Sequence, residues 1–174
     1  PLGSLCAQTG DARGRIDAYE SVGDLAPRDA PFLRDLADAY RRGRRASEAL
    51  AVAQLAAQLD PDSASSYQCL GDALLATEAT RAADDAYQQA LALDPASAAA
   101  ECGRGAVHLA AAHWSAARAS FERALAIDPD CPDARYNRAL LDLRAGNLRA
   151  GYVAYPAIME TAEQRPRYHY YYEG

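Results

Sequence analysis

The sequence predicts an all-α protein, a right-handed α-solenoid of about four and a half helix–turn–helix repeats. Three observations lead to this prediction. Pro27, Pro61, Pro95 and Pro129 are equally spaced along the chain, and the last three of them close similar phrases such as Leu-Asp-Pro. Small and aromatic residues also recur at constant distances before these prolines. A fixed period of about 34 residues indicates an array of stacked supersecondary units. The surfaces of such arrays bind more often than they catalyse.

The recurring positions predict how the two helices of one repeat pack. An aromatic slot lies eight residues before each proline, and a small-residue slot lies twenty-four residues before it. The aromatic slot holds Tyr19, Tyr87 and Phe121, with Ala53 as the exception; the small slot holds Ala37, Gly71 and Gly105. Small residues let helix backbones approach, and aromatic rings fill the wider gaps.

These residues resemble the tetratricopeptide repeat. Residues 64–97 match its helix–turn–helix pattern at every slot, which are Tyr67, Leu70, Gly71, Leu74, Ala83, Tyr87, Ala90 and Pro95. The next repeat matches with gaps, because Glu101 and Arg104 replace apolar residues and His108 replaces the usual tyrosine. The resemblance implies a protein-binding scaffold whose first helices line a concave groove.

The elements follow in order from this register. Residues 1–4 look like the remnant of a cleaved fusion tag. Residues 5–29 are expected to be a partial repeat whose second helix runs over 12–24, so the native N-terminus is expected to be missing. Full repeats are expected at 30–63, 64–97 and 98–131, each with two helices of about a dozen residues. Their turns are expected at Gly43, at 77–80 and at 112–113.

A fourth repeat is expected at 132–165. Pro132 suits the first turn of a helix, where no N–H partner is lost. The second helix, from Leu148 to about Gln164, departs from the pattern because Gly151 and Pro156 interrupt it. This repeat is either a cap or a junction to another domain. The tail at 166–174 is rich in tyrosine and is either a disordered terminus or a strip that lies on an apolar surface.

A second resemblance covers residues 140–155. This stretch looks like the last repeat of bacterial proteins in which a Gly-aromatic-x-x-Tyr phrase closes the array before a glycosyltransferase domain. The match ends at 156–158. It implies that the chain recruits substrates for a larger enzyme.

Composition narrows the classes of function. The net charge of −6 argues against general nucleic-acid binding, which needs a basic face. No apolar run is long enough to cross a bilayer. No catalytic set or phosphate loop is visible, and His108, His113 and His169 are too scattered for a metal site, so we expect no catalytic residue, cofactor or metal.

The cysteines, Cys6, Cys69, Cys102 and Cys131, show no closely spaced pair. We expect free buried thiols and therefore a reducing, cytoplasmic location. A bridge between Cys69 and Cys102 is an alternative, because both fall near equivalent faces of successive first helices.

The resemblance to the tetratricopeptide family implies that ligand-binding side chains project from the first helices. The positions that match are Arg34, Asp38, Arg41, Gln68, Cys69, Asp72, Cys102, Tyr136, Asn137 and Leu140. Chaperone-binding members hold a carboxylate with a set of Lys, Asn and Arg on three consecutive first helices, and the matching places here hold Arg34, Asp38, Cys69, Ala99 and Gly103, of which only Arg34 is a base. The asparagine ladder of sugar-transferase members would need four asparagines, and here only Asn137 is present. Neither known groove type predicts the partner.

The run from Arg41 to Arg45 is the densest charge cluster. It could receive an acidic segment or a phosphate. Alternatively, Arg41 and Arg42 offset the dipole at a helix C-terminus that Gly43 caps, and we favour this interpretation.

The predicted function is a protein–protein interaction module that binds a peptide or protein segment in the concave groove. Two alternatives remain open. One is the substrate-recruiting domain of a bacterial glycosyltransferase. The other is a scaffold that assembles into a homo-oligomer through the groove or the tyrosine-rich tail.

Overall fold

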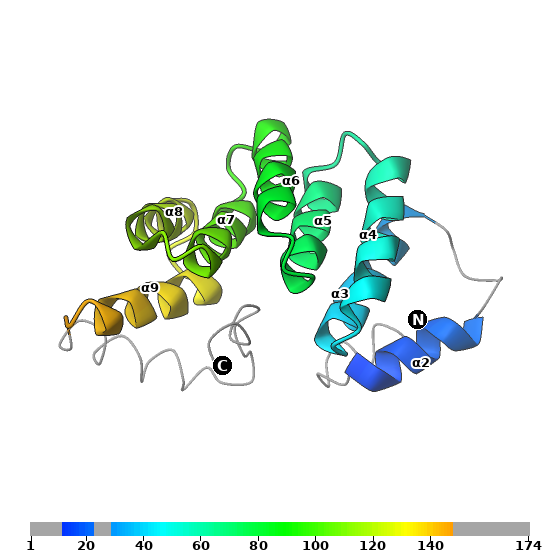
Figure 1. The fold of residues 1–174 in the computed structure, drawn as a ribbon. Coiled ribbons are helices and arrows are strands. Elements are labelled where there is room, and N and C mark those ends of the chain that lie inside the picture. Colours follow the sequence, from blue (N-terminus) through cyan, green and yellow to red (C-terminus); the bar gives the residue numbers. More distant parts are fainter. Residues whose placement is uncertain (1–11, 23–28, 148–174) are drawn as a thin grey trace. The chain divides into compact units, whose positions relative to one another are not determined.

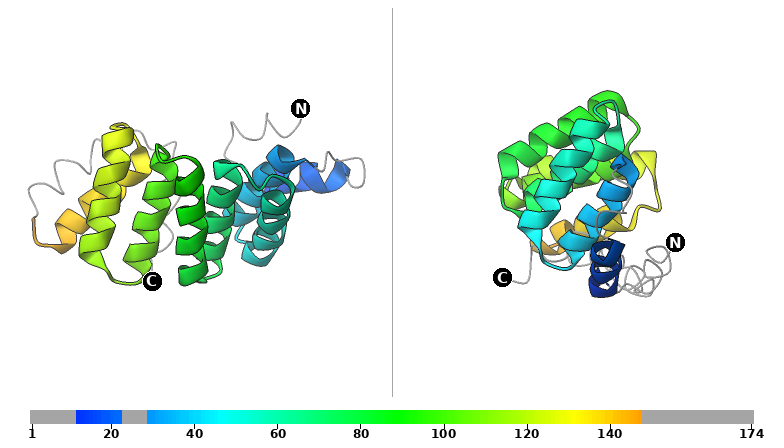
Figure 2. Two further views of the ribbon diagram at one scale, coloured as in Figure 1. Left: turned by 90° about the horizontal axis from the view of Figure 1, so that it is seen from above. Right: turned by 90° about the vertical axis from the view of Figure 1, so that its right-hand side faces the viewer.

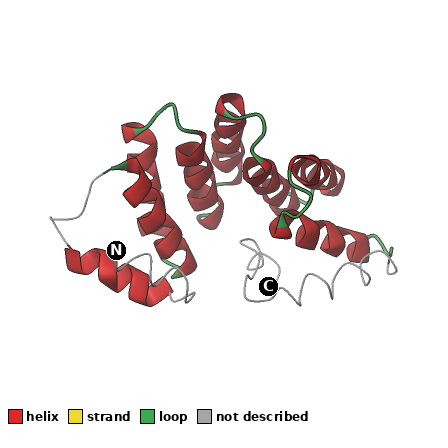
Figure 3. Ribbon diagram, turned by 180° about the vertical axis from the view of Figure 1, so that it is seen from behind, coloured by secondary structure: helices red, strands yellow, loops and turns green. Residues whose placement is uncertain are grey.

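The structure, a computed structural model, describes residues 12–22 and 29–147, and every regular element within them is a helix (Figure 1). In chain order these are α2 (Ala12–Val22), α3 (Ala30–Arg42), α4 (Ala46–Leu59), α5 (Ala64–Ala76), α6 (Thr80–Leu93), α7 (Ala98–Ala110), α8 (Trp114–Ile127) and α9 (Pro132–Arg144). Short turns join the two helices of each repeat (Figure 3). The all-α prediction and the expected helix–turn–helix order are confirmed for the described residues.

The helices form two compact units that divide between Leu93 and Asp94. In the first unit, α3 packs on α4 and α5 on α6, while α2 packs on α3 and α4 on α5. In the second unit, α7 packs on α8, and α9 packs on α8 and touches α7. Figure 2 shows the neighbouring helices of each unit lying side by side. The repeat boundaries deduced from the sequence remain predictions, as does the helix expected at 148–164, which lies outside the described residues together with 1–4 and 166–174.

The predicted pairing of small and aromatic slots is present in two repeats. A Cβ atom added to Gly71 would lie 2.7 Å from Tyr87 Cε1, and one added to Gly105 would lie 2.7 Å from Phe121 Cδ1. Both rings are fully buried. The repeat at 30–63 uses two alanines at these slots, and Ala37 and Ala53 belong to one buried cluster. In two repeats a glycine of the first helix therefore faces a large ring of the second helix. In the repeat at 30–63, two alanines fill the corresponding space between the helices.

The turns inside the repeats share one backbone conformation. The residues with positive φ are Arg44 (61°), Glu78 (62°), Ala112 (58°) and Gly146 (79°), which occupy equivalent positions of successive repeats. Gly43 is the C-cap of α3, as expected, but its φ of −77° is ordinary. A Cβ atom there would lie 2.7 Å from Cδ1, the end of the Ile16 side chain in α2, so a larger residue would require that side chain to shift.

Candidate functional site

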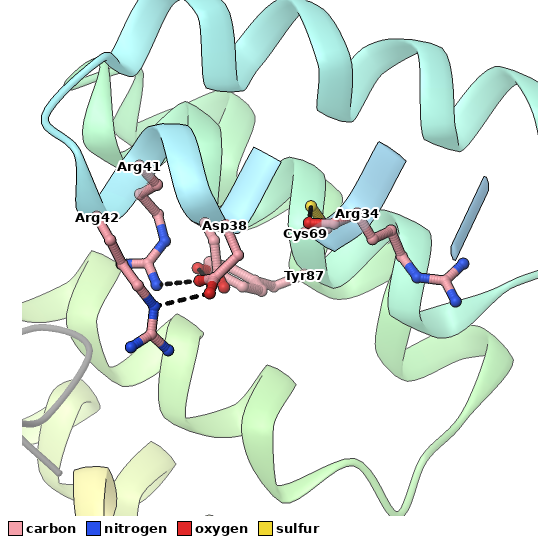
Figure 4. A network of polar contacts seen from close by, with 7 residues as sticks. Arg34, Asp38, Arg41, Arg42, Cys69 and Tyr87 are labelled. Carbon is pink, nitrogen blue, oxygen red and sulfur yellow. Dashed lines mark hydrogen bonds and ion pairs between the residues drawn. The ribbon is translucent and has the colours of Figure 1, made fainter. Parts of the chain in front are cut away.

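In the first unit, the first helices α3 and α5 bring six of the predicted site residues onto neighbouring elements, and five of them are partly exposed. We call the partly exposed set Arg34, Asp38, Arg41, Gln68 and Cys69 the first-helix face. Arg34 Nη1 donates a hydrogen bond to Ser66 Oγ at 3.2 Å and lies 3.8 Å from Asp60 Oδ2. The Cys69 thiol lies 3.9 Å from the Arg34 carbonyl oxygen (Figure 4). Polar groups of two consecutive repeats therefore meet on this face.

Asp38 is the partner of the arginines at the end of α3 (Figure 4). Its two carboxylate oxygens accept hydrogen bonds from Arg41 Nη2 and Arg42 Nε, each at 2.7 Å. These contacts favour the helix-terminus interpretation of the arginine cluster, because the cations are already neutralised within their own helix.

Arg45, the last cation of the cluster, also has local partners. Its Nε bonds to Glu48 Oε1 at 2.9 Å, and its guanidinium lies 4.6 Å from the centre of the Tyr40 ring. The hydrogen bond from Arg45 lowers the pKa of Glu48. Both side chains of this ion pair are exposed, so the pair adds little to stability.

Asp72 is a predicted site residue that the fold itself uses. Its side chain is buried, and its Oδ1 accepts a hydrogen bond of 2.6 Å from the hydroxyl of the buried Tyr87. The bond anchors the ring that fills the space beside Gly71. Cys69, nearby on the same helix, is poorly suited to be a nucleophile, because burial and then the Asp72 and Asp38 carboxylates raise its pKa to about 12.

In the second unit, three of the predicted residues are buried. Cys102 is 1 % exposed, Tyr136 2 % and Asn137 0 %. Leu140 is partly buried against Tyr136 and Ala139. Asn137 Nδ2 donates to the Asp133 carbonyl oxygen at 2.8 Å, whereas its Oδ1 has no partner. These side chains contribute to packing in the described structure.

Glu101 explains one departure from the family pattern. It occupies a family apolar position and is buried, and its Oε1 accepts a hydrogen bond of 2.9 Å from Arg123 Nε. This bond raises the pKa of Arg123. An ion pair between α7 and α8 therefore replaces an apolar contact.

Sequence reasoning missed Ser66, Asp60 and Cys131, which contact predicted site residues. For Cys131 the signal was the N-cap slot that it shares with Asp29, Ser63 and Ser97, whereas Asp60 is the C-cap of α4 and Ser66 lies in the first turn of α5, so that slot does not indicate them. Within the described ranges, no three His, Cys, Asp or Glu side chains gather closely enough to hold a metal ion. None of the helices described is both long and apolar enough to pass through a membrane.

Comparisons with known proteins agree with this architecture. Residues 64–97 match the family described as Tetratricopeptide repeat. No curated protein sequence matches the chain. Among solved structures, a thermophilic TPR protein of Thermus thermophilus shares 23 % identity with a TM-score of 0.82, and the match covers 94 % of this chain and 89 % of that one.

Two further structures are similar. MamA shares 26 % identity with a TM-score of 0.65, and the match covers 94 % of this chain and 95 % of MamA. The first TPR domain of Spaghetti (RPAP3), bound to the HSP90 peptide SRMEEVD, shares 19 % identity with a TM-score of 0.60, over 68 % of this chain and 94 % of that domain. The chain is therefore a protein of the tetratricopeptide-repeat fold, with a recognisable repeat of that family at residues 64–97.

Proposed function

We propose that the chain is a protein-interaction module and that its first-helix face binds a peptide segment. The observation that carries the proposal is the contact of α3 with α5, two first helices of consecutive repeats that each carry partly exposed polar side chains. Repeat arrays present such faces without building a closed catalytic cleft. The RPAP3 domain, a structural neighbour with a bound peptide, supports this class of function.

Arg34 and Gln68 are the side chains best placed to hold a peptide backbone. They occupy the same slot in consecutive repeats. Only Nη1 of Arg34 is engaged in the contacts of the described residues, so its Nε and Nη2 groups can donate to carbonyl oxygens of a bound segment. The Gln68 amide can both donate and accept, which suits an extended backbone.

The proposal does not extend to a carboxylate clamp. Asp38 and Cys69 occupy two of the positions where that clamp has Lys, Asn or Arg, and the Cys69 thiol stays protonated. We therefore propose recognition of an internal extended segment rather than of an acidic C-terminus.

Peptide selection followed by affinity measurement tests the proposal. A random peptide library displayed on phage is selected against the purified chain, and the Kd of a selected peptide is measured by fluorescence polarisation. The double variant Arg34→Ala with Gln68→Ala should weaken binding at least about tenfold, which corresponds to ~1.4 kcal/mol. The matched control is Arg81→Ala with Gln89→Ala, which removes the same residue types from positions of the second helix α6.

The control should change the Kd less than about twofold. Equal loss in both double variants would move the binding surface away from the first-helix face. Failure to select any peptide would contradict peptide recognition altogether.

The two alternatives remain predictions. Light scattering tests the self-assembly alternative, which expects a concentration-dependent mass above that of the monomer. The recruiting-domain alternative depends on residues 140–155, and its Gly-aromatic-x-x-Tyr phrase lies outside the described residues.

A further inference from the structure

Two buried thiols of the second unit are in contact. Cys102 lies on α7 and is 1 % exposed, while Cys131 is the N-cap residue of α9 and is 8 % exposed. Both are free cysteines, their elements α7 and α9 are in contact, and the Cys102 thiol is placed to donate a hydrogen bond to the sulfur of Cys131. Because the two residues are far apart in the sequence, spacing alone did not indicate a pair. The bridge considered from the sequence paired Cys102 with Cys69, which is also a free thiol in the structure.

The register of the repeat explains why these two residues meet. Cys131 occupies the N-cap slot, where Asp29 and Ser97 use side-chain oxygens to accept N–H bonds from Phe32 and Ala100. Cys131 has no side-chain oxygen to make such a bond, and only its sulfur faces the equivalent N–H, that of Ala134. A sulfur atom therefore stands where the other repeats place a polar cap.

Cys102 occupies the slot of Arg34 and Gln68. In the first unit, the Arg34 side chain at this slot reaches Ser66 in the first turn of the next first helix. In the second unit, Cys102 at this slot is placed to reach Cys131, the N-cap of α9, which lies three residues before the position equivalent to Ser66. In both units a side chain at this slot therefore approaches the start of the next first helix.

The surroundings of Cys131 favour its thiolate. The Cys102 hydrogen bond lowers the pKa of Cys131 to about 7, and the Ala134 backbone N–H adds a smaller contribution, although burial and the carboxylates of Asp133 and Asp128 oppose both. A thiol at a helix N-terminus with a depressed pKa is the reactive type of cysteine. The flanking residues Asp130 and Pro132 are exposed, so a small reagent meets Cys131 before Cys102.

We propose that Cys102 and Cys131 form a reversible disulfide by exchange with a low-molecular-weight disulfide. The Cys131 thiolate attacks one sulfur of the reagent, a mixed disulfide forms, and one reagent thiolate leaves and takes up a proton. Cys102 loses its proton to solvent and attacks Cys131 Sγ, and the second reagent thiolate leaves. The two cysteines together lose two electrons and two protons, and the reagent is reduced to two thiols.

The bond would tie the first helices α7 and α9 together and close a loop that contains α8. Cross-linking residues about 30 apart restricts the unfolded chain, so the melting temperature of the second unit should rise by about 5–15 °C on oxidation. This inference is independent of the proposed peptide binding.

The experiment uses the full chain with Cys6→Ser and Cys69→Ser, so that only the pair remains. The folded protein is incubated with oxidised glutathione at neutral pH, quenched with acid, alkylated and analysed by mass spectrometry. The expected product has lost two hydrogen atoms, resists alkylation and yields a cross-linked tryptic peptide that contains Cys102 and Cys131. Two glutathione adducts without a cross-link, or a cross-link that forms only in urea, would overturn the proposal.

Two matched variants separate the roles of the sulfurs. With Cys102→Ala, Cys131 should accumulate as a stable glutathione adduct, because no second thiol resolves it. Cys131→Ser introduces the residue type of two other N-caps, Ser63 and Ser97. In this variant, glutathione should modify Cys102 at least about tenfold more slowly than it modifies Cys131 in the Cys102→Ala variant. Equal rates of modification in the two variants would show that Cys131 is not the attacking thiol.

The pH dependence of the rate of Cys131 modification is a further test, because a thiol that only packs in the interior would not produce it. The rate of Cys131 modification in the pair should rise through about pH 7 and level off above it. In the Cys102→Ala variant the midpoint should move to higher pH, since the hydrogen bond that stabilises the thiolate is lost. An unchanged midpoint would contradict the contact between the two thiols.

Discussion

Single residues in the turns show how the repeat tolerates local strain. Arg44, Glu78, Ala112 and Gly146 occupy one slot and share a left-handed backbone, yet only the last is glycine. A side chain at positive φ places its Cβ atom close to the following carbonyl oxygen. The period of the array therefore requires the conformation even where the residue disfavours it.

Ala112→Gly should stabilise the protein by about 0.5–1 kcal/mol, because glycine adopts a φ of 58° without steric cost. The measurement is urea denaturation followed by circular dichroism. Ala111→Gly is the matched control, since this neighbour has a φ of −84° and should lose stability through added freedom in the unfolded chain. The same sign for both changes would contradict the strain argument.

Cys69 should make stability sensitive to alkaline pH. Its thiol has a pKa of about 12 in the folded chain and an ordinary value of 9.0. The folded-state pKa is raised, so the contribution to stability is complete below about pH 9 and is lost as pH rises toward 12. Cys69→Ala should therefore reduce the fall in unfolding free energy between about pH 8 and pH 10.5. Urea denaturation at both pH values measures this, and identical slopes for parent and variant would refute it.

At the scale of the element, the contact between the two helices of a repeat depends on complementary sizes. Gly71 leaves room for the Tyr87 ring, which the hydrogen bond to Asp72 holds in place. Because the ring is fully buried and anchored, it cannot move aside for a larger neighbour.

Gly71→Leu should cost about 3 kcal/mol or more, since the side chain would occupy the space of the Tyr87 ring. Chemical denaturation gives the free energy of unfolding. Ala82→Leu, on the exposed side of α6, introduces a leucine away from the core and should change stability by less than about 0.5 kcal/mol. A melting temperature that Gly71→Leu leaves unchanged would contradict the packing argument.

The N-cap residues Ser63 and Ser97 occupy the same slot of two repeats but should contribute differently to the free energy of unfolding. Ser97 Oγ accepts the Ala100 N–H at 3.2 Å, whereas Ser63 makes no side-chain cap bond. Ser97→Ala should therefore cost about 1 kcal/mol and Ser63→Ala less than about 0.5 kcal/mol. Thermal denaturation of the two variants compares them directly, and equal losses would show that the cap bond contributes nothing.

At the scale of the whole molecule, the chain consists of two compact units of repeated helices. The stability of such an array is approximately a sum of repeat terms and nearest-neighbour terms. A local defect should therefore open the repeat in which it lies before it affects distant ones.

Gly71→Ala and Gly105→Ala form a pair that tests this localisation. Each adds one methyl group against a buried ring, in the first and the second unit respectively. Hydrogen–deuterium exchange with mass spectrometry should show faster exchange in α5 and α6 for Gly71→Ala, and in α7 and α8 for Gly105→Ala. Equal acceleration across both units in either variant would show that the molecule unfolds as one cooperative body.

The helix bounds could be predicted closely because their signals are local. Each repeat places its N-cap, its small and aromatic slots and its closing proline at the same intervals, and the structure follows them. The second helix of the partial repeat is described over Ala12–Val22, and the last two positions of the expected range 12–24 lie outside the described residues. The turn at Gly43 was expected, but the positive φ lies one residue later, at Arg44, in the slot that Glu78, Ala112 and Gly146 occupy in the other repeats.

The candidate site was less predictable because availability depends on contacts between helices. Arg34 and Asp72 were equivalent candidates in the sequence. In the structure Arg34 remains partly exposed, while Tyr87 engages Asp72 in the interior. The meeting of Cys102 and Cys131 could have been foreseen only by aligning the N-cap slot with the first-helix slot of the preceding repeat.

The amino-acid sequence by itself determined the class of fold, the order of the helices and the residues that pack inside each repeat. The constant period of the repeats constrains these features, because each depends on neighbours within one helical pair. Only the tertiary structure decided which polar side chains of α3 and α5 remain partly exposed and which two thiols lie together. Those outcomes depend on how one repeat lies against the next, which spacing along a chain does not specify.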